Sequence, residues 1–316
     1  WAIFDFITPG VFEDELEDFE EMYLEMGGYK DREVIGYKNN EKFERIFHEY
    51  SARITLREAQ TQAGRKPYRV VRKRIEVELG EESRRAYDEL NRDLETVLSG
   101  RKIKTPLVLT LVGKLQQIAG GFVIHTEKRY HDDGTPILKA NGKPLVDREI
   151  VRVGREKLKA LEQLVTMNSD FADKFVICAL YTHEIDAISR SLTRLGRTWK
   201  IISGKTQFDG TFDCDCIIMN EKSAESFDLG HATTFCFFSW AHSFIAYDQS
   251  RFRVLRFDTK LINEYYIVAK NTVDESILAA IKEHQSVARH LWDTARHSQG
   301  RLGRNSPRVS QTTARA

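Results

Sequence analysis

The sequence lacks several features that would assign a functional class at once. It has no apolar run of about 18 residues, so we expect no membrane span. It also lacks a charged-then-apolar signal peptide. None of its four cysteines forms a CxxC pair, which indicates a reducing, cytoplasmic environment rather than a disulfide framework. Cys214 and Cys216 stand two apart without a second ligand pair, so we predict no metal site.

An excess of charge of either sign is also missing. The chain has 48 Lys and Arg against 47 Asp and Glu, so only local clustering could indicate a polyanionic partner. One such cluster is the tail, residues 294–316, which contains five arginines and no acidic residue. Its low hydrophobicity and uniform charge predict disorder and a weak contact with nucleic acid.

A phosphate-binding loop of the form GxxxxGK[ST] is absent as well. The best candidate is "IISGKT", but Trp199 stands where the first glycine is needed, and no apolar helix follows Thr206. This chain by itself therefore has no evident binding site for a nucleoside triphosphate.

What the sequence does contain is a change of pattern at Gly154. Its 316 residues suit about two domains. Before Gly154 the pattern is mostly helical, with expected helices at residues 12–26, 36–54, 80–100 and 105–121 and a strand at 68–79. Turn signals at Asp133-Gly134 and Asn141-Gly142 then predict a small β-meander.

After Gly154 apolar strands alternate with helices. This alternation predicts an α/β fold in which a parallel sheet of five or six strands within residues 154–293 is covered by helices on both faces. The expected strands are residues 174–181, 199–204, 214–220, 233–239 and 262–270, with a long closing helix over 272–293.

Glutamine and arginine are concentrated in "QSRFRVLR", residues 249–256. On a helix, Gln249, Arg253 and Arg256 stand at i, i+4 and i+7 and share one face, whereas Arg251 points elsewhere. That face is either a solvated edge, a phosphate-binding surface, or a set of arginine fingers that reach a nucleotide in a neighbouring domain.

This stretch resembles the sixth motif of superfamily 2 helicases of the Swi/Snf-like class, roughly QAxxRxxRIGQ, although its ending differs. Other segments are similar to further elements of that family, in the family's order. "DKFVICALYTHEIDAISRSL" resembles the opening of the second RecA-like domain, and "FDLGHAT" a degenerate fifth motif without its glycine. "NTVDES" and "GKLQQIAGGFV" resemble the closing TxDE element and the helix before that domain. The spacing is most similar to the phage and prokaryotic branch.

The resemblance implies an architecture. Residues 1–105 would be the end of the first helicase core domain and a helical linker, truncated at the N-terminus. Residues 106–150 would be a bridging helix and β-meander insertion, residues 151–293 the second RecA-like domain, and residues 294–316 the disordered basic tail.

It also implies a function: the C-terminal portion of an ATP-dependent DNA helicase or translocase. Arg253 and Arg256 would act as catalytic fingers, and with Gln249 they would contact ATP, whose Mg²⁺ is held by the missing first domain. The implied partners are that domain and nucleic acid, most simply double-stranded DNA, gripped by its backbone near Thr182, Gly204, Lys205 and Ser239.

Two other interpretations stay open. One is a degenerate RecA-like module that binds nucleic acid or protein without hydrolysis, favoured by the missing fifth-motif glycine. The other is an unrelated doubly wound transferase, which would need a Gly-rich loop after its first strand. "LYTHEIDAI" offers none. Trp240 is either a base-stacking residue or part of the core, and His242 is expected at the surface.

Overall fold

The computed structural model describes residues 2–27, 33–51, 54–93, 95–98, 101–104, 108–167, 174–204, 210–220 and 227–282. The chain divides into two compact units, Trp1–Arg65 and Lys66–Ala316, which are taken in turn. None of the helices in the described ranges is long and apolar enough to cross a bilayer.

The first unit contains short helices and one hairpin. The expected helix over residues 12–26 is wrong at its end: it stops at Tyr23, because Leu24 pairs with Tyr37 and starts an antiparallel strand. An aromatic cluster forms the core, in which the rings of Phe12 and Phe43 stack with centroids 5.0 Å apart. The elements are α1 (Ala2–Ile7), α2 (Leu16–Tyr23), β1 (Leu24–Gly27), β2 (Glu33–Tyr37), α3 (Asn40–Tyr50) and α4 (Leu56–Gln62).

The second unit is built on a six-stranded sheet in the order β3-β12-β11-β8-β10-β9. Every neighbouring pair in it is parallel, which confirms the predicted α/β class with a parallel sheet. Five strands match the predicted ones: β8 (Phe175–Ala179), β9 (Trp199–Ile202), β10 (Cys216–Asn220), β11 (Thr234–Phe237) and β12 (Leu261–Ala269).

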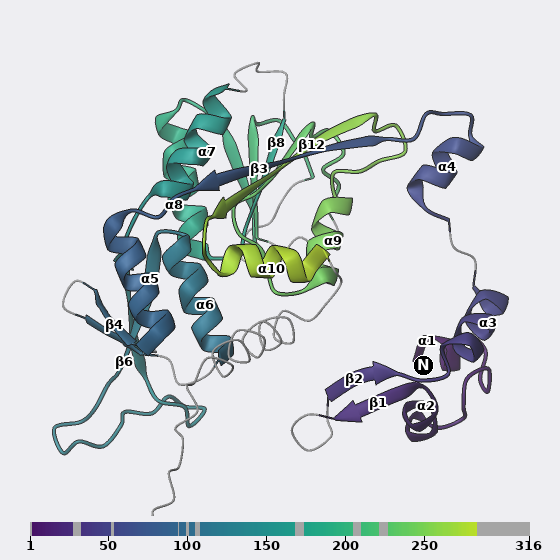
Figure 1. Cartoon of the computed structure of the whole chain (residues 1–316), viewed down its shortest axis with the longest axis horizontal. Coiled ribbons are helices and arrows are strands. Elements are labelled where there is room, and N and C mark those ends of the chain that lie inside the picture. Colours follow the sequence, from purple (N-terminus) through teal and green to yellow (C-terminus); the bar gives the residue numbers. More distant parts are fainter. Residues whose placement is uncertain are drawn as a thin grey trace, which may run out of the picture. The chain divides into compact units, whose positions relative to one another are not determined.

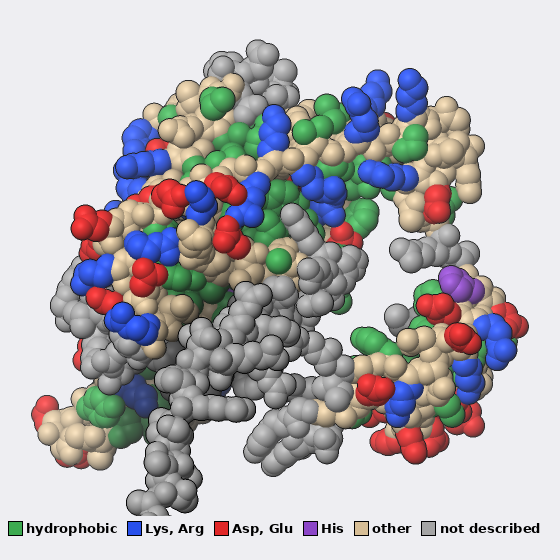
Figure 2. All heavy atoms as spheres, viewed as in Figure 1, with side chains coloured by type: hydrophobic (Ala, Val, Ile, Leu, Met, Phe, Trp, Pro, Cys, Tyr) green, Lys and Arg blue, Asp and Glu red, His purple; other side chains and the backbone are tan. Residues whose placement is uncertain are grey.

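The sixth strand comes from far upstream. β3 (Arg69–Val77) pairs with β12 along its whole length, from Arg69 opposite Leu261 to Val77 opposite Ala269. Its alternating pattern predicted a strand, but it lies before Gly154, where we expected the sheet to begin. Figure 2 shows Lys and Arg side chains gathered over this edge strand, on which Arg69, Arg72, Lys73 and Arg74 are exposed.

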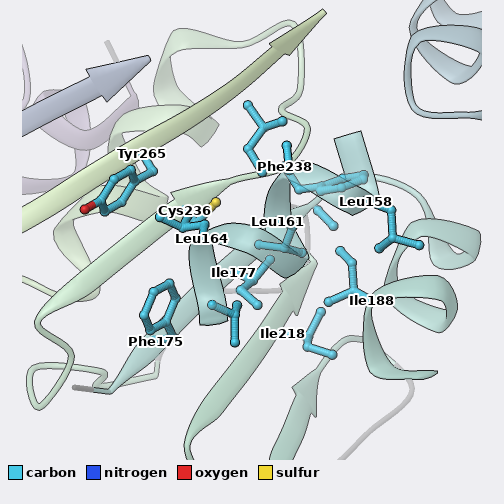
Figure 3. Packing of buried hydrophobic residues seen from close by; sticks show 14 of the residues in the cluster. Leu158, Leu161, Leu164, Phe175, Ile177, Ile188, Ile218, Cys236, Phe238 and Tyr265 are labelled. Atoms are coloured by element: carbon cyan, nitrogen blue, oxygen red, sulfur yellow. The ribbon is translucent and has the colours of Figure 1, made fainter. Parts of the chain in front are cut away.

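Helices cover both faces of the sheet (Figure 1). On one face, α7 (Glu156–Met167) and α8 (Thr182–Arg194) pack on a large apolar cluster that includes Ile177, Ile218 and Cys236 (Figure 3). The neighbour of Cys236, Phe237, points to the opposite face. There its ring stacks on Tyr247 of α9 (Phe244–Phe252), and α10 (Val273–Lys282) packs on β12.

The remaining elements precede the first strand predicted for the sheet. The expected helix over residues 80–100 is too long: α5 (Glu81–Asp93) ends early, and β4 (Glu95–Leu98) pairs with β5 (Arg101–Lys104). α6 (Val108–Ala119) ends at the predicted glycine pair. β6 (Phe122–Lys128) and β7 (Val146–Arg152) form an antiparallel hairpin, which agrees with the predicted β-meander.

The expected closing helix over 272–293 is described only as α10, up to Lys282. The predicted disordered tail, residues 294–316, lies outside the described residues.

Candidate functional site

The sheet has a topological switch point between the carboxyl ends of β8 and β11. These two strands are neighbours, but the chain leaves β8 through α8 on one face and leaves β11 through α9 on the other. In open parallel sheets such a reversal of connections marks the usual ligand-binding position. Side chains that follow Ala179 and Phe237 are therefore candidates for contact with a ligand.

The residues expected to contact nucleic acid follow strand ends, as predicted. Thr182 begins α8 and is exposed, and Gly204, two residues after β9, is exposed too. Ser239 differs, since it is 1% exposed and its hydroxyl accepts a hydrogen bond from the Leu180 N–H at 2.8 Å. Lys205 lies outside the described residues.

Ser239 belongs to a buried polar network that sequence reasoning missed. Its hydroxyl donates to Oε2 of Glu184, a carboxyl that is 2% exposed and also accepts from the Tyr181 N–H at 3.2 Å. Burial raises the pKa of Glu184 to about 7, although nearby Lys157 and the Ser239 hydroxyl act in the opposite direction. Its other oxygen, Oε1, is buried and has no hydrogen-bond partner among the described residues. Glu184 is therefore poised to change protonation near neutral pH.

One glutamine of α6, Gln116, ties the segment after β11 to this edge. Gln116 Nε2 donates to the Trp240 carbonyl at 2.9 Å, and its Oε1 lies 3.2 Å from His242 Nε2. Trp240 is 1% exposed, so it belongs to the core and is not available for base stacking. His242 is half-buried rather than fully at the surface.

The arginine segment differs from the predicted helical face. α9 ends at Phe252, so Arg253 caps the helix and Arg256 lies in the following turn. The prediction that Gln249, Arg253 and Arg256 share one face of a continuous helix is therefore wrong. Gln249 remains exposed near the end of the helix.

Arg251 is a structural residue. Its Nε donates to Glu264 Oε1 at 2.9 Å, where the two side chains are 14% and 1% exposed. Arg72 of β3 binds the other oxygen of Glu264 at 2.9 Å. The expectation that Arg251 points away from the arginine face is correct, but it points into a buried network.

Arg253 carries a buried guanidinium nitrogen without a partner. Its Nε is shielded from solvent and makes no hydrogen bond within the described part of the chain. Its carbonyl accepts from the Leu229 N–H at 3.0 Å, which fixes the backbone against the "FDLGHAT" segment. An unpaired buried donor on a cationic group is costly unless a ligand satisfies it.

Arg256 is held by the same segment. Its Nη2 lies 2.6 Å from Asp228 Oδ1, and this hydrogen bond lowers the pKa of the Asp228 carboxyl. The structure thus brings the sixth-motif-like stretch and the fifth-motif-like stretch into contact, with Arg253 unpaired and Arg256 paired. The Arg256–Asp228 ion pair and the hydrogen bond from the Leu229 N–H to the Arg253 carbonyl could not be predicted from sequence spacing, because both depend on where α9 ends.

Comparisons with known proteins give only distant matches. No family model matches the chain, and no curated protein matches it. Among solved structures, the C-terminal part of the Fun30 ATPase domain aligns with a TM-score of 0.48 at 15% identity, over 67% of this chain and 88% of that one. The SWI2/SNF2 ATPase core of Sulfolobus solfataricus in complex with double-stranded DNA aligns with a TM-score of 0.45 at 15% identity, over 89% of this chain and 57% of that one.

Proposed function

We propose that this chain is the C-terminal portion of an ATP-dependent DNA translocase or helicase, in which Arg253 contacts the phosphates of ATP held by a first RecA-like domain. The observation that carries this proposal is the buried, unpartnered Nε of Arg253 in a segment that resembles the sixth motif of Swi/Snf-like enzymes. A phosphate oxygen would supply the acceptor that Arg253 lacks, so the residue present fits the ligand.

The guanidinium of Arg253 would act on charge that develops during phosphoryl transfer. Arg256 reaches a phosphate only if it exchanges its bond to Asp228. The side chains of that ion pair are 32% and 70% exposed, and exposed pairs contribute about 0–1 kcal/mol to stability. Exchanging Asp228 for a phosphate therefore costs little free energy. Gln249 would be a polar neighbour of the nucleotide, and Mg²⁺ would be held by the first domain.

Nucleic acid would be gripped along its backbone at the carboxyl edge of the sheet. Thr182 and Gly204 follow strand ends there, and Lys205 comes next in the sequence; such contacts are independent of base sequence. Ser239 enters this proposal as a positioning residue, because its buried hydroxyl holds Glu184 and the Leu180 backbone. The exposed cations of β3 add a second surface that suits a polyanion.

The test is DNA-stimulated ATP hydrolysis by the complete polypeptide with Arg253→Ala. We expect kcat to fall by about 10³-fold or more with little change in ATP binding, because a finger acts mainly in the transition state. Arg253→Lys should not restore it, since an ammonium cannot replace the guanidinium fork. The matched control is Arg85→Ala on α5, whose side chain is 56% exposed and pairs with Glu89 on the same helix. A loss below about tenfold for Arg253→Ala would refute the finger role.

A second candidate is a RecA-like module that binds nucleic acid without hydrolysis. The Arg256–Asp228 ion pair favours it, because one of the two proposed fingers is already occupied. This candidate predicts that the complete polypeptide binds duplex DNA but hydrolyses no ATP, so the same assay separates the two.

A further inference from the structure

A cavity of about 720 Å³ lies on the α8 side of the second unit. It is bounded by strand β7, helix α8 and the residues that join β7 to α7. Volumes of this size are typical of sites for small molecules. Its lining includes Phe122, Arg148, Arg152, Arg155, Leu158, Glu184, Arg190, Arg194 and Phe238.

Arginine dominates the charge of this cavity. Five arginines line it against three acidic residues, Glu149, Glu184 and Asp186. Arg155 and Arg194 are partly neutralised, because each binds Glu162 Oε1, at 3.1 and 3.0 Å.

The other three arginines lack such an ion pair in the described part of the chain. Within the described ranges, the side chains of Arg148, Arg152 and Arg190 make no hydrogen bond or ion pair. Arg152 and Arg190 are also exposed, so neither is held in place by the core. Unpaired guanidinium groups that converge on one recess are the usual means of recognising phosphate.

Two elements present these arginines from different sides. Arg148 and Arg152 are four residues apart on β7, so their side chains leave the same face of the strand. Arg190 and Arg194 are one turn apart on α8 and also share a face. Because all four line one cavity, an anion with more than one phosphoryl group can contact both elements at once.

The inner wall of the cavity is apolar and buried, with Phe122, Leu158 and Phe238 each at most 9% exposed. Glu184 also faces the cavity, with its unpartnered Oε1. Burial raises its pKa to about 7, so at neutral pH and below much of this carboxyl is uncharged and does not repel an anion. A buried inner wall suits a compact ligand better than a DNA duplex, which needs an open surface.

This cavity is separate from the proposed finger. Phe238 and Leu158 belong to the apolar cluster under α7 and α8, whereas the helix that Arg253 caps packs on Phe237, on the opposite face of the sheet. The two sites can therefore be tested independently.

We propose that this cavity binds a compact free anion carrying two or more phosphoryl groups, held between the arginines of β7 and those of α8. The probe is sodium tripolyphosphate, titrated into the 316-residue chain at pH 7 and low salt and followed by calorimetry. We expect one saturable site, with inorganic phosphate binding more weakly because a single phosphoryl group offers fewer charged oxygens to the arginines of the two elements.

The deciding variant is R152A/R190A, which removes one exposed arginine from each element. It should raise the Kd for tripolyphosphate about 100-fold, at about tenfold or about 1.4 kcal/mol per arginine. The matched control is R85A/R129A, which removes two exposed arginines that do not line the cavity and should change the Kd less than about twofold.

Three results would overturn the proposal: no saturable binding of tripolyphosphate, equal weakening by both double variants, or a 20-base-pair duplex that needs Arg152 and Arg190 while tripolyphosphate does not. The third result would assign these arginines to a nucleic-acid surface. The proposed ATPase role of Arg253 would stand in each case.

Discussion

Lys157 Nζ lies 2.9 Å from Asp274 Oδ2, and both side chains are 1% exposed. The pair connects the first turn of α7 to the first turn of α10. Asp274 also accepts from the Ala269 N–H at 3.1 Å, at the end of β12, and the Lys157 ammonium lies 5.3 Å from the ring centroid of Phe238. This ion pair therefore fixes the starts of two helices to the carboxyl edge of the sheet.

We expect Lys157→Met to lower the free energy of unfolding by about 3–5 kcal/mol, because it leaves the Asp274 carboxylate buried without its counter-charge. Urea unfolding at pH 7 measures the change. The double variant K157M/D274N removes both charges and keeps an acceptor for Ala269, so it should be more stable than K157M. A single variant within about 1 kcal/mol of wild type would contradict this account.

The pH dependence of stability should report on Glu184. Its pKa is about 7 in the folded chain against an ordinary value of 4.5, so the folded state holds the extra proton between these values. The contribution of Glu184 to stability is therefore complete below about pH 4.5 and is lost as pH rises towards 7, by at most about 1.4 kcal/mol per unit. The charged groups around it, Lys157 and Asp274, act on this pKa in opposite directions.

Glu184→Gln should abolish this contribution, because an amide does not titrate over that range. The difference in unfolding free energy between variant and wild type, measured at pH 5 and at pH 8, should therefore shift in favour of the variant at pH 8. Asp186→Asn, at an exposed position of the same helix, is the control and should keep the wild-type pH dependence. Parallel pH profiles for E184Q and wild type would contradict the prediction.

Arg251 and Arg253 should separate stability from activity. Arg251→Ala breaks a bond to the buried Glu264, but Arg72 still contacts that carboxylate, so we expect a loss of about 2–4 kcal/mol in unfolding free energy. Arg253→Ala removes no side-chain hydrogen bond seen in the described part of the chain and should cost less than about 1 kcal/mol. Thermal unfolding of the two variants checks this, and equal losses would contradict it. Arg251→Ala is for this reason no neutral control in an ATPase assay.

Gly121→Ala should be strongly destabilising. Gly121 has φ +92°, and a Cβ there would lie 2.5 Å from the Gly154 carbonyl oxygen, a backbone atom with little freedom to move. We expect a loss of more than about 2 kcal/mol in urea unfolding. Gly134→Ala is the control, because its φ is +82° but a Cβ there meets nothing within 4 Å. If both variants lose equal stability, the close approach to Gly154 has no effect.

The sequence predicted the class of fold because parallel strands buried on both faces leave a direct trace in apolar content. β8 and β11 are buried at every residue, and β12 is nearly so. Helix ends were predicted poorly, since they depend on contacts made elsewhere in the chain. α2 ends at Tyr23 because Leu24 pairs with Tyr37, and local propensity contains no information about that partner.

The candidate site shows the same division. Its residue types could be identified from "QSRFRVLR", but the roles of individual arginines could not. Arg251 meets Glu264 and Asp248, whereas the Nε of Arg253 meets no hydrogen-bond partner among the described residues, and this difference depends on where α9 ends. The buried network around Glu184 left no motif, because its members come from separate helices and strands.

The pairing of β3 with β12 has a consequence for the order of assembly. Arg72 and Glu264 are 192 positions apart, so during synthesis β3 emerges long before its neighbour β12 exists. Contacts so distant in sequence close slowly. Until then β3 is an unpaired strand, and its cations discourage pairing with other chains. We therefore expect β3 to join the sheet last. Until β12 has been made, the cations of β3 should limit aggregation of the upstream part of this unit.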